Sequence, residues 1–355
     1  MSFLSTPIML TLFFAMFLFS LWLQSAWKSA ALKDLHQVYD SLQKIHEGHI
    51  PRLGGLILYV FLVTIVWTNN FSGSELLRPV LLALLPTVGV TLIEDLFNNI
   101  QPKARLVSIV LSSMLLVFAT DVSLPRIDIP GVMDFFIAYP FLLSMLLVLS
   151  LSGLANGFNM IDGANGLLYM SFISILCSMI FLAHALDSLM YVNINSVILI
   201  LVCISLVFNY PYGQIFAGDL GAYCLGLLIG FLSISFFAEH PELITWYALL
   251  ILFYPTFEIL FSMYRRFRLR KSLMQADASH LHQLLFRLLC QRFSNKVANN
   301  LIVIILSPIW IFPLVWLMFF GASMNFFMTW LGILSEVILY LMFYCGIQKI
   351  LHEAK

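Results

Sequence analysis

The chain has 355 residues, of which 61% are hydrophobic and 10% charged, and its mean hydropathy is +0.96. Soluble globular domains carry roughly 25% charged residues, so this composition excludes a water-soluble globule and favours a helical membrane protein. The formal net charge is zero, so the bulk charge indicates no nucleic-acid partner, and membrane lipid is the expected surrounding.

Hydrophobic runs that can cross a bilayer recur along the whole chain. A spanning helix needs about 20 mainly apolar residues. Eleven candidate runs cover residues 4–25, 53–69, 76–94, 105–121, 134–153, 166–185, 190–209, 219–238, 243–263, 299–320 and 324–347. We therefore expect an all-α polytopic integral membrane protein with about eleven transmembrane helices, forming a single domain over residues 1–355.

The Lys and Arg residues orient these spans. If the N-terminus lies outside, all but two of the 18 Lys and Arg residues fall in inner loops or at the inner C-terminus, and the exceptions are Arg78 and Arg126. Positive residues favour cytoplasmic loops. The pattern predicts a periplasmic N-terminus and a cytoplasmic C-terminus. No Lys or Arg precedes the first run, so we expect a retained helix rather than a secretory signal.

The stretch Leu151–Leu167 is polar where a membrane protein can least easily be polar. It carries Asn156, Asn159, Asp162 and Asn165 between two apolar runs. An ionisable group at such a place indicates function. The helix that restarts after Gly166 turns its N-terminal amides toward these groups, which suits phosphate binding. The stretch predicts a cation and phosphate pocket, and the alternative is a turn that only caps two helices.

Two adjacent acids, Glu94 and Asp95, end the third run, where the helix dipole favours cations instead. A divalent cation relieves the repulsion of paired carboxylates, and Mg²⁺ takes carboxylates, waters and substrate phosphates as ligands. Lys103 and Arg105 open the next run and can pair with the acids or hold a phosphate. A surface ion-pair cluster is the alternative.

Two further inner loops carry candidate groups. His46, His49 and Arg52 precede a glycine pair, which suggests an anion-binding entrance or a positive-inside anchor with interfacial histidines. Asp219 lies between Gly218 and Gly221 at the start of the eighth run, where it can also serve as a plain N-cap.

The longest polar segment, Tyr264–Asn300, contains the pair His280 and His282. Residues separated by one position do not share a helical face, so the two rings converge only if the segment is extended or irregular. They can contact a diphosphate, orient a carboxylate or contribute protons. The alternative is a basic amphipathic helix on anionic lipid. Glu258, near the inner end of the ninth run, is another candidate for a polar cluster.

The candidate groups all fall on the inner face that the Lys and Arg pattern defines. They are Glu94, Asp95, Asp162, Asp219, Asp277, His280 and His282. Helix N-termini near residues 54, 102, 167 and 218 point their positive ends to the same plane. The sequence therefore predicts one cytoplasmic site, built from loops near 26–53, 94–105, 153–166, 209–219 and 264–298.

Five motifs in this order resemble the polyprenyl-phosphate N-acetylhexosamine-1-phosphate transferase superfamily, which is glycosyltransferase family 4. They are HEGHIPRLGG, IEDLFNNIQPKARL, NGFNMIDGANGL, FAGDLGAYCLG and DASHLHQLL. The resemblance implies transfer of a sugar-1-phosphate from a UDP-sugar to undecaprenyl phosphate with release of UMP. It also implies Mg²⁺, with Mn²⁺ as a substitute, a bacterial inner-membrane location and a homodimer. O-antigen initiation is an expected pathway.

The resemblance also implies roles for individual residues. The expected catalytic groups are Glu94, Asp95, Asp162, His280 and His282. The expected metal ligands are Asp219 and Asp95. The expected substrate contacts are Arg52, Lys103, Arg105, Asn156, Asn159, Asn165, Gly218 and Asp277.

Four positions depart from the family pattern. Glu94 replaces an Asp that is common there, Asn165 a second Asp, Ala222 a Ser and Gln283 a third His. These changes suggest a subfamily for a less familiar sugar, or reduced activity. A direct in-line attack is the expected mechanism, with Asp95 positioning or deprotonating the lipid phosphate, and a covalent route through Asp162 or Asp95 stays open. The alternative functions are a secondary transporter, which would place charges near the bilayer midplane, and an inactive lipid-binding relative.

Overall fold

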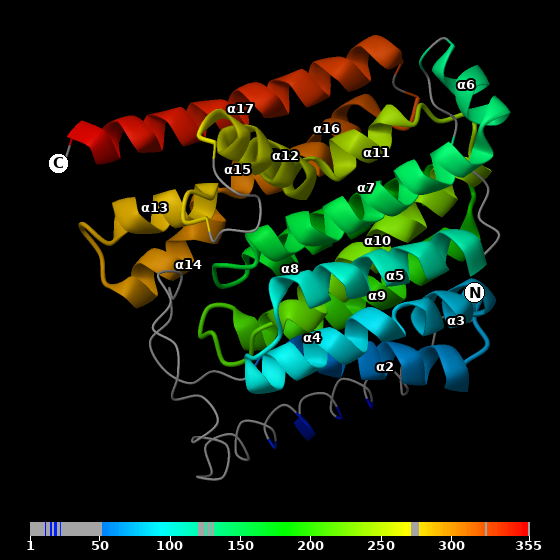
Figure 1. Ribbon diagram of the computed structural model, residues 1–355, viewed down its shortest axis with the longest axis horizontal. Coiled ribbons are helices and arrows are strands. Elements are labelled where there is room, and N and C mark those ends of the chain that lie inside the picture. The colour runs from blue at the N-terminus through cyan, green and yellow to red at the C-terminus, as the bar shows by residue number, and fades with distance from the viewer. Residues whose placement is uncertain are drawn as a thin grey trace.

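The computed structural model describes residues 52–119, 131–270, 277–323 and 325–353, together with the isolated positions 11, 15, 18, 19, 22, 125 and 129. Every regular element in this part of the chain is a helix (Figure 1). The predicted all-α class is confirmed. The predicted first span 4–25 lies almost wholly outside the described residues, and so do His46 and His49.

The helices follow one another with short connections. They are α2 (Gly54–Thr68), α3 (Ser74–Ala83), α4 (Leu85–Phe97), α5 (Pro102–Ala119), α6 (Val132–Ala138), α7 (Pro140–Ile161), α8 (Leu167–Ala185), α9 (Leu189–Asn209), α10 (Gly218–Glu239), α11 (Trp246–Ile251), α12 (Phe253–Arg268), α13 (Leu281–Leu289), α14 (Asn295–Ile305), α15 (Ser307–Trp310), α16 (Phe312–Phe320) and α17 (Phe326–Glu353).

Several of these helices are long and apolar enough to cross a membrane. In the described part of the chain six pass this test: α7, α8, α9, α10, α17 and the stretch Asn295–Phe320. The pair α3 and α4 raises the number to seven if it is one bent span. The protein is therefore a multi-pass membrane protein. The count of eleven spans and the orientation of the termini stay predictions.

Prolines divide three of the runs that the sequence presents as continuous. Helices α3 and α4 meet at a bend of 56°, next to Pro86 in the first turn of α4. The run 243–263 is divided into α11 and α12, with Pro255 in the first turn of α12. The run 299–320 becomes α14, α15 and α16. Proline lacks the N–H of a helical hydrogen bond and its ring clashes with the preceding turn.

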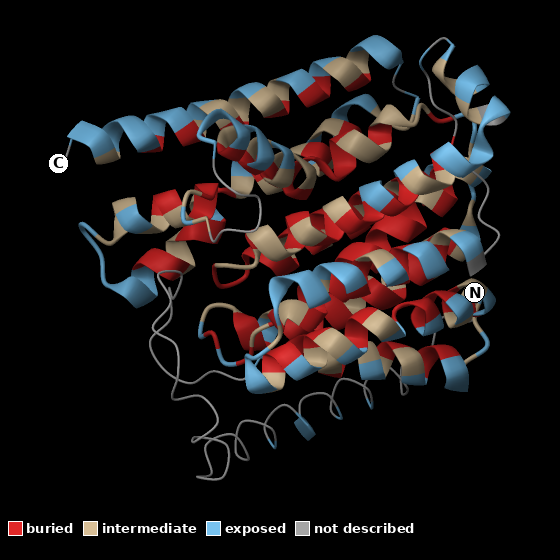
Figure 2. Ribbon diagram, in the orientation of Figure 1, coloured by how far each residue is buried: buried red, intermediate tan, exposed pale blue. Residues whose placement is uncertain are grey.

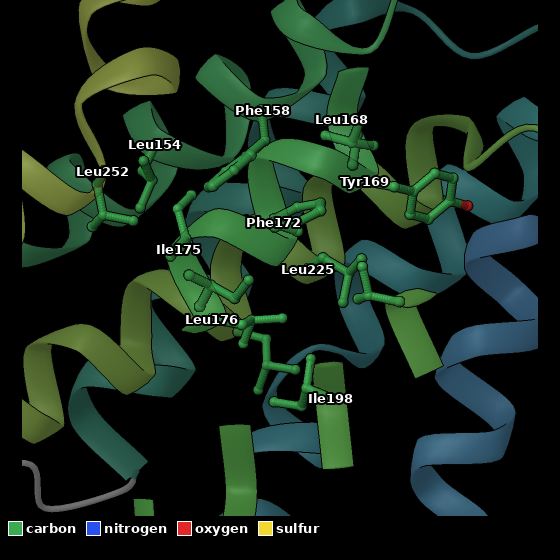
Figure 3. Packing of buried hydrophobic residues seen from close by; sticks show 14 of the residues in the cluster. Leu154, Phe158, Leu168, Tyr169, Phe172, Ile175, Leu176, Ile198, Leu225 and Leu252 are labelled. Atoms are coloured by element: carbon green, nitrogen blue, oxygen red, sulfur yellow. The ribbon is translucent and has the colours of Figure 1, made fainter. Parts of the chain in front are cut away.

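Helix α10 forms the centre of the bundle. In its apolar window 94% of the residues are buried, and it packs on α2, α4 and α7. Figure 2 shows buried residues along α8, α9 and α10 and exposed residues along the outer side of α17. Figure 3 shows Phe158 of α7 stacked on Phe172 of α8 near Leu225 of α10, with ring centroids 4.4 Å apart. This apolar core holds the helix ends that carry the polar groups.

The polar helix ends gather at one end of the bundle. The end of α4 and start of α5, the end of α7 and start of α8, and the end of α9 and start of α10 all lie on the left of Figure 1, where α13 and α14 also lie. Helix α7 continues to Ile161, so Asn156 and Asn159 are helical and the connection to α8 is limited to residues 162–166. The predicted loop 153–166 is thus shorter than expected, because small residues let α7 pack closely: a Cβ on Gly157 would lie 2.3 Å from the Pro255 carbonyl oxygen.

Candidate active site

Asp95 joins the end of α4 to the start of α10. Its Oδ1 accepts the backbone N–H of Asp219 at 2.9 Å, and its Oδ2 accepts that of Leu220 at 2.9 Å. The free N–H groups of a first helical turn and the positive end of the dipole both favour a carboxylate at this place. Asp95 is therefore the cap of α10 and fixes the backbone that carries Asp219.

Gly218 permits this close approach. Its φ is +72°, and a Cβ at this position would lie 2.4 Å from the Arg52 carbonyl oxygen and 2.6 Å from Asp95 Oδ2. Only glycine fits such a backbone without strain. Beside it, the amides of Gly54 and Gly55 donate to the carbonyl oxygens of Phe216 and Ala217. The backbone at the start of α2 is thus bound directly to the segment that precedes α10.

Arg105, in the first turn of α5, connects two acids. Its Nη1 pairs with Asp219 Oδ2, and the same atom lies 3.6 Å from Glu94 Oε1. Glu94 Oε2 accepts the backbone N–H of Ile100 at 2.7 Å, which holds the connection between α4 and α5. Glu94, Arg105 and Asp219 therefore form one charged cluster, and the longer side chain at position 94 reaches both the loop and the guanidinium.

Tyr223 is a neighbour of this cluster that the sequence analysis missed. It lies one helical turn after Asp219 on α10, and its hydroxyl accepts a hydrogen bond from Asn159 Nδ2 at 3.0 Å. The spacing of four residues from Asp219 was the signal that could have found it. Asn156, by contrast, donates to Ser152 O in its own helix.

Asp162 follows the last residue of α7. No hydrogen bond or ion pair from residues 52–119, 131–270, 277–323 or 325–353 reaches its carboxylate. Burial raises its pKa to about 7, Arg52 acts to lower that pKa, and Asp219 acts to raise it. Asp162 is therefore an acid within the electrostatic field of both Arg52 and Asp219, with its oxygens free for a cation or a substrate.

His282 packs on the connection that follows Asp162. A Cβ on Gly163 would lie 2.1 Å from His282 Nε2, so the ring occupies the space that glycine leaves open. Both ring nitrogens are buried, and neither has a hydrogen-bond partner in the described part of the chain. Burial, together with the charge of His280, lowers the pKa of His282 to about 3, so the ring is neutral at neutral pH.

His280 belongs to a second set of contacts. Its Nδ1 lies 2.9 Å from Glu258 Oε1, and Tyr340 donates to Glu258 Oε2 at 2.7 Å. The His280 backbone N–H donates to Gln283 Oε1, so the residue that replaces a third histidine helps to cap α13. The two histidine rings lie parallel, 6.1 Å apart. The condition for their convergence is met, because His280 is extended and precedes α13.

Asp277 holds the start of the segment that leads to His280 against α12. It accepts hydrogen bonds from Ser262 Oγ and the Ser279 N–H, and it pairs with Arg265 and Arg266. Burial acts to raise its pKa, but the hydrogen bond and charge of Arg265 outweigh burial and lower it. These contacts hold Asp277 in the fold around α12 and α13. Its expected contact with substrate stays a prediction.

Asn165 is held by α14. Its N–H donates to Asn299 Oδ1 at 2.8 Å, and its Nδ2 donates to Asn300 Oδ1 at 2.9 Å. The next residue, Gly166, donates its N–H to Asn209 Oδ1 at 2.6 Å. The asparagine at position 165 therefore connects the start of α8 to α14. The sequence carries no local signal that Asn299 and Asn300 are its partners.

The remaining expected substrate contacts are open to solvent. Arg52 and Lys103 are exposed at the same end of the bundle, and Lys103 has no ion-pair partner in the described part. Arg52 still acts on the pKa of Asp162. The fold thus gathers Asp162, Asp219 and the Arg105 cluster, and it sets His282 beside the connection that begins with Asp162.

The carboxylates of the site meet the needs of a magnesium ion only in part. Among the described residues no three side chains of His, Cys, Asp or Glu form a group that can hold a metal ion. Mg²⁺, however, is usually bound through one or two carboxylates, with waters and substrate phosphates as the other ligands. The Asp219 side chain is 13% exposed, and Asp162 has no protein partner in the described ranges. Asp162 and Asp219 are therefore acids of the kind that such an ion takes, although Asp219 Oδ2 already pairs with Arg105, while both oxygens of Asp95 accept backbone hydrogen bonds.

The geometry of the site indicates a membrane protein that acts on phosphate groups at the bilayer surface. Acids, an arginine and a neutral histidine gather where membrane helices end, which suits that chemistry. Residues 77–237 match the family described as Glycosyl transferase family 4.

Curated relatives extend this match over most of the chain. It is 23% identical over 270 residues to a probable undecaprenyl-phosphate N-acetylglucosaminyl 1-phosphate transferase of Bacillus subtilis, covering 75% of this chain and 73% of that one. It is 26% identical over 308 residues to an undecaprenyl-phosphate alpha-N-acetylglucosaminyl 1-phosphate transferase of Thermotoga maritima, covering 86% and 88%. A decaprenyl-phosphate N-acetylglucosaminephosphotransferase of Mycolicibacterium smegmatis is 26% identical over 282 residues, covering 70% and 68%. Part of the chain is thus similar to glycosyl transferase family 4, and these relatives are named as transferases of a sugar phosphate to a polyprenyl phosphate.

Proposed function

We propose that this protein transfers a sugar-1-phosphate from a UDP-sugar to undecaprenyl phosphate. A phosphate oxygen of the lipid attacks the sugar-bearing phosphorus of the donor. A new P–O bond forms there, the bond from that phosphorus to the oxygen it shares with the uridine phosphate breaks, and UMP leaves with the electron pair. The products are undecaprenyl-diphosphate-sugar and UMP.

One observation carries this proposal: the carboxylate of Asp162, which has no partner in the described part, feels the charge of Asp219. Asp95 fixes the backbone of Asp219, and both acids lie at ends of membrane helices in a chain that matches family 4 over residues 77–237. Two phosphate groups carry several negative charges between them, and bringing them together is the main barrier. A site that offers fixed cations and a place for a metal ion lowers that barrier.

Each residue has a distinct part in this scheme. Asp219 and Asp162 would hold a magnesium ion, which neutralises phosphate charge when bound. Arg52, Lys103 and Arg105 supply positive charge for the phosphates. His282 is neutral with two unpaired nitrogens, so it can donate one hydrogen bond to a phosphate oxygen.

The lipid phosphate needs little help from a base. A phosphate monoester has a second pKa near about 6, so it is largely a dianion at neutral pH. We therefore give Asp95 the task of positioning Asp219 and leave the attack to the lipid phosphate itself. A covalent route through Asp162 or Asp95 is the alternative, and a radiolabelled sugar-phosphate retained on the protein in the absence of lipid would reveal it.

The finer assignments belong to the same proposal. The sugar is an N-acetylhexosamine or a deoxy derivative, and the product initiates a cell-envelope polysaccharide such as O-antigen. The enzyme lies in the bacterial inner membrane with the site facing the cytoplasm, as a homodimer. The names of the relatives support a polyprenyl-phosphate acceptor and an N-acetylglucosamine donor.

The test is UMP release by the detergent-purified chain with undecaprenyl phosphate, Mg²⁺ or Mn²⁺, and a panel of UDP-N-acetylhexosamines that includes 6-deoxy forms. We expect UMP only when lipid, metal and one donor are present together. Asp219→Asn should abolish it, while Asp134→Asn, at an exposed acid in α6, should not. Monodisperse protein that releases no UMP from any donor would contradict the proposal. Uptake of solute by proteoliposomes would then favour a transporter.

A further inference from the structure

Arg105 lies between the carboxylates of Asp219 and Glu94. Its Nη1 pairs with Asp219 Oδ2 and also lies 3.6 Å from Glu94 Oε1. The Asp219 side chain is 13% exposed and the Glu94 side chain 9%, so neither acid is open to bulk solvent. The guanidinium is thus the charge that both acids share.

The segments that carry the two acids are tied by backbone hydrogen bonds, whereas part of the arginine has no partner. Asp95 holds the backbone of Asp219 through two hydrogen bonds, and Glu94 is held by the Ile100 N–H. The Arg105 side chain is 22% exposed, and its Nε is buried with no partner in the described part of the chain. A buried donor without a partner costs free energy, so the present pairing does not satisfy the whole guanidinium.

A cation on Asp219 would compete with the present pairing. Arg105 Nη1 pairs with Asp219 Oδ2, and its positive charge would repel an ion bound to the same carboxylate. A cation that takes Oδ2 would therefore displace the guanidinium. Glu94 Oε1 is the nearest other carboxylate oxygen, and an aspartate at position 94 would be shorter by one methylene.

We propose that Arg105 is a positioning residue that exchanges partners: it pairs with Asp219 when the metal position is empty and moves onto Glu94 when a divalent cation binds. Glu94 then sets the cation affinity by accepting the displaced arginine. The inference rests on the proposed cation position at Asp219 and adds the device that controls it. It gives the glutamate at position 94 a task distinct from binding the ion.

The test measures cation binding without substrate. Free Mn²⁺ is followed by electron paramagnetic resonance during titration into the full chain in detergent, for the wild type, Glu94→Gln, Arg105→Gln and the double variant. Glutamine at position 94 keeps the oxygen that accepts the Ile100 N–H, so the loop contact is retained. Arg292→Gln is the matched control, because it removes an exposed positive charge that has no side-chain partner in the described part and no place in the proposed site.

We expect Arg105→Gln to raise Mn²⁺ affinity about tenfold and Arg292→Gln to change it less than about twofold. Glu94→Gln should lower affinity about fivefold when Arg105 is present and less than about twofold when it is absent. Such coupling shows that Glu94 acts through Arg105. If Glu94→Gln is not monodisperse, Glu94→Asp replaces it, with the same dependence on Arg105 expected.

Two other results have separate meanings. Equal effects of Glu94→Gln in both backgrounds would overturn the exchange, since Glu94 would then act on the ion directly. An Asp219→Asn variant that binds Mn²⁺ like the wild type would instead overturn the proposed cation position. Retained Asp219-dependent binding with additive Glu94 and Arg105 effects leaves the proposed function standing and removes only the exchange.

Discussion

The two oxygens of Asp95 accept the backbone N–H groups of Asp219 and of the residue after it, each at 2.9 Å. One acid of the site thus fixes the position of another across 124 residues of sequence. An Asp219 whose backbone is already held should bind a cation with higher affinity than a flexible one, because less ordering is needed when the ion binds.

Asp95→Asn should weaken both the fold and the site. An amide keeps one acceptor oxygen and turns a donor toward the other N–H, which leaves a buried donor unsatisfied at a cost of about 1–3 kcal/mol. We expect a lower midpoint of thermal unfolding in detergent and a weaker Mn²⁺ affinity. Asp134→Asn, at an exposed position, is the control. An unchanged midpoint would show that the two hydrogen bonds do not stabilise α10.

Gly163→Ala should reduce activity by displacing the ring of His282. The added Cβ would lie 2.1 Å from His282 Nε2, so the ring must move. A misplacement of about 1 Å in a site can cost about 10²-fold in rate, and we expect a loss of that order in UMP release. Gly153→Ala is the matched control, since a Cβ there meets no atom within 4 Å. Equal activity of the two variants would exclude His282 from the site.

Cation binding should depend on pH through Asp162. Its pKa is raised to about 7, so the carboxyl is largely protonated at about pH 6 and ionised at about pH 8. Because a metal ion needs the ionised form, Mn²⁺ affinity should rise several-fold between about pH 6 and about pH 8. Asp162→Asn should bind more weakly and with a flatter pH dependence. A variant profile parallel to that of the wild type would assign the titration to another group.

Acid should destabilise the fold through His282. Its pKa falls from 6.5 to about 3 on burial, so between these pH values the unfolded chain is protonated at His282 while the folded chain is not. Stability is therefore lost as pH falls below 6.5, by about 2 kcal/mol at about pH 5. We expect the unfolding midpoint to fall less between about pH 7 and about pH 5 in His282→Gln. The same change at the exposed His184 should leave the acid sensitivity of the wild type.

An aspartate at position 165 should destabilise this chain. Asn165 Nδ2 donates to Asn300 Oδ1 at 2.9 Å, and Asn165 Oδ1 is buried with no hydrogen-bond partner in the described part, so an aspartate would bring a charge into this buried place. We expect Asn165→Asp to lower the unfolding midpoint by an amount equal to about 1–3 kcal/mol. No loss in this variant would show that this contact does not hold α8 to α14.

The sequence predicted the long apolar helices closely. The expected runs 166–185, 190–209 and 219–238 agree within one residue with α8, α9 and α10. Each is a hydrophobic run bounded by polar residues or glycine, so its ends are visible locally. The division into α11 and α12 was not predicted, although Pro255 is a local signal for it. The extension of α7 to Ile161 was not predicted because it depends on the close packing of Gly157 against the Pro255 carbonyl.

The sequence identified the candidate residues and the membrane side on which they lie, but it did not identify the residues that they contact. Asp162, Asp219 and His282 were all expected at one membrane face, and the fold brings Asp162 into the field of Asp219. The division of tasks was not predicted: the cap on α10, the arginine shared by two acids and the asparagines of α14 all depend on contacts between distant segments. The catalytic and metal-binding roles stay predictions until the variants are measured.

By itself the sequence determined the helical membrane class, the long spans and the face on which the polar groups gather. Hydrophobicity and charge act locally and add along the chain, so these properties can be deduced without a fold. Only the tertiary structure decided that Asp95 caps α10, that Asp162 has no partner in the described part and that Arg105 lies between Glu94 and Asp219. A hydrogen bond or ion pair forms only within a few ångströms, and packing of the core alone brings residues so far apart in sequence to that distance.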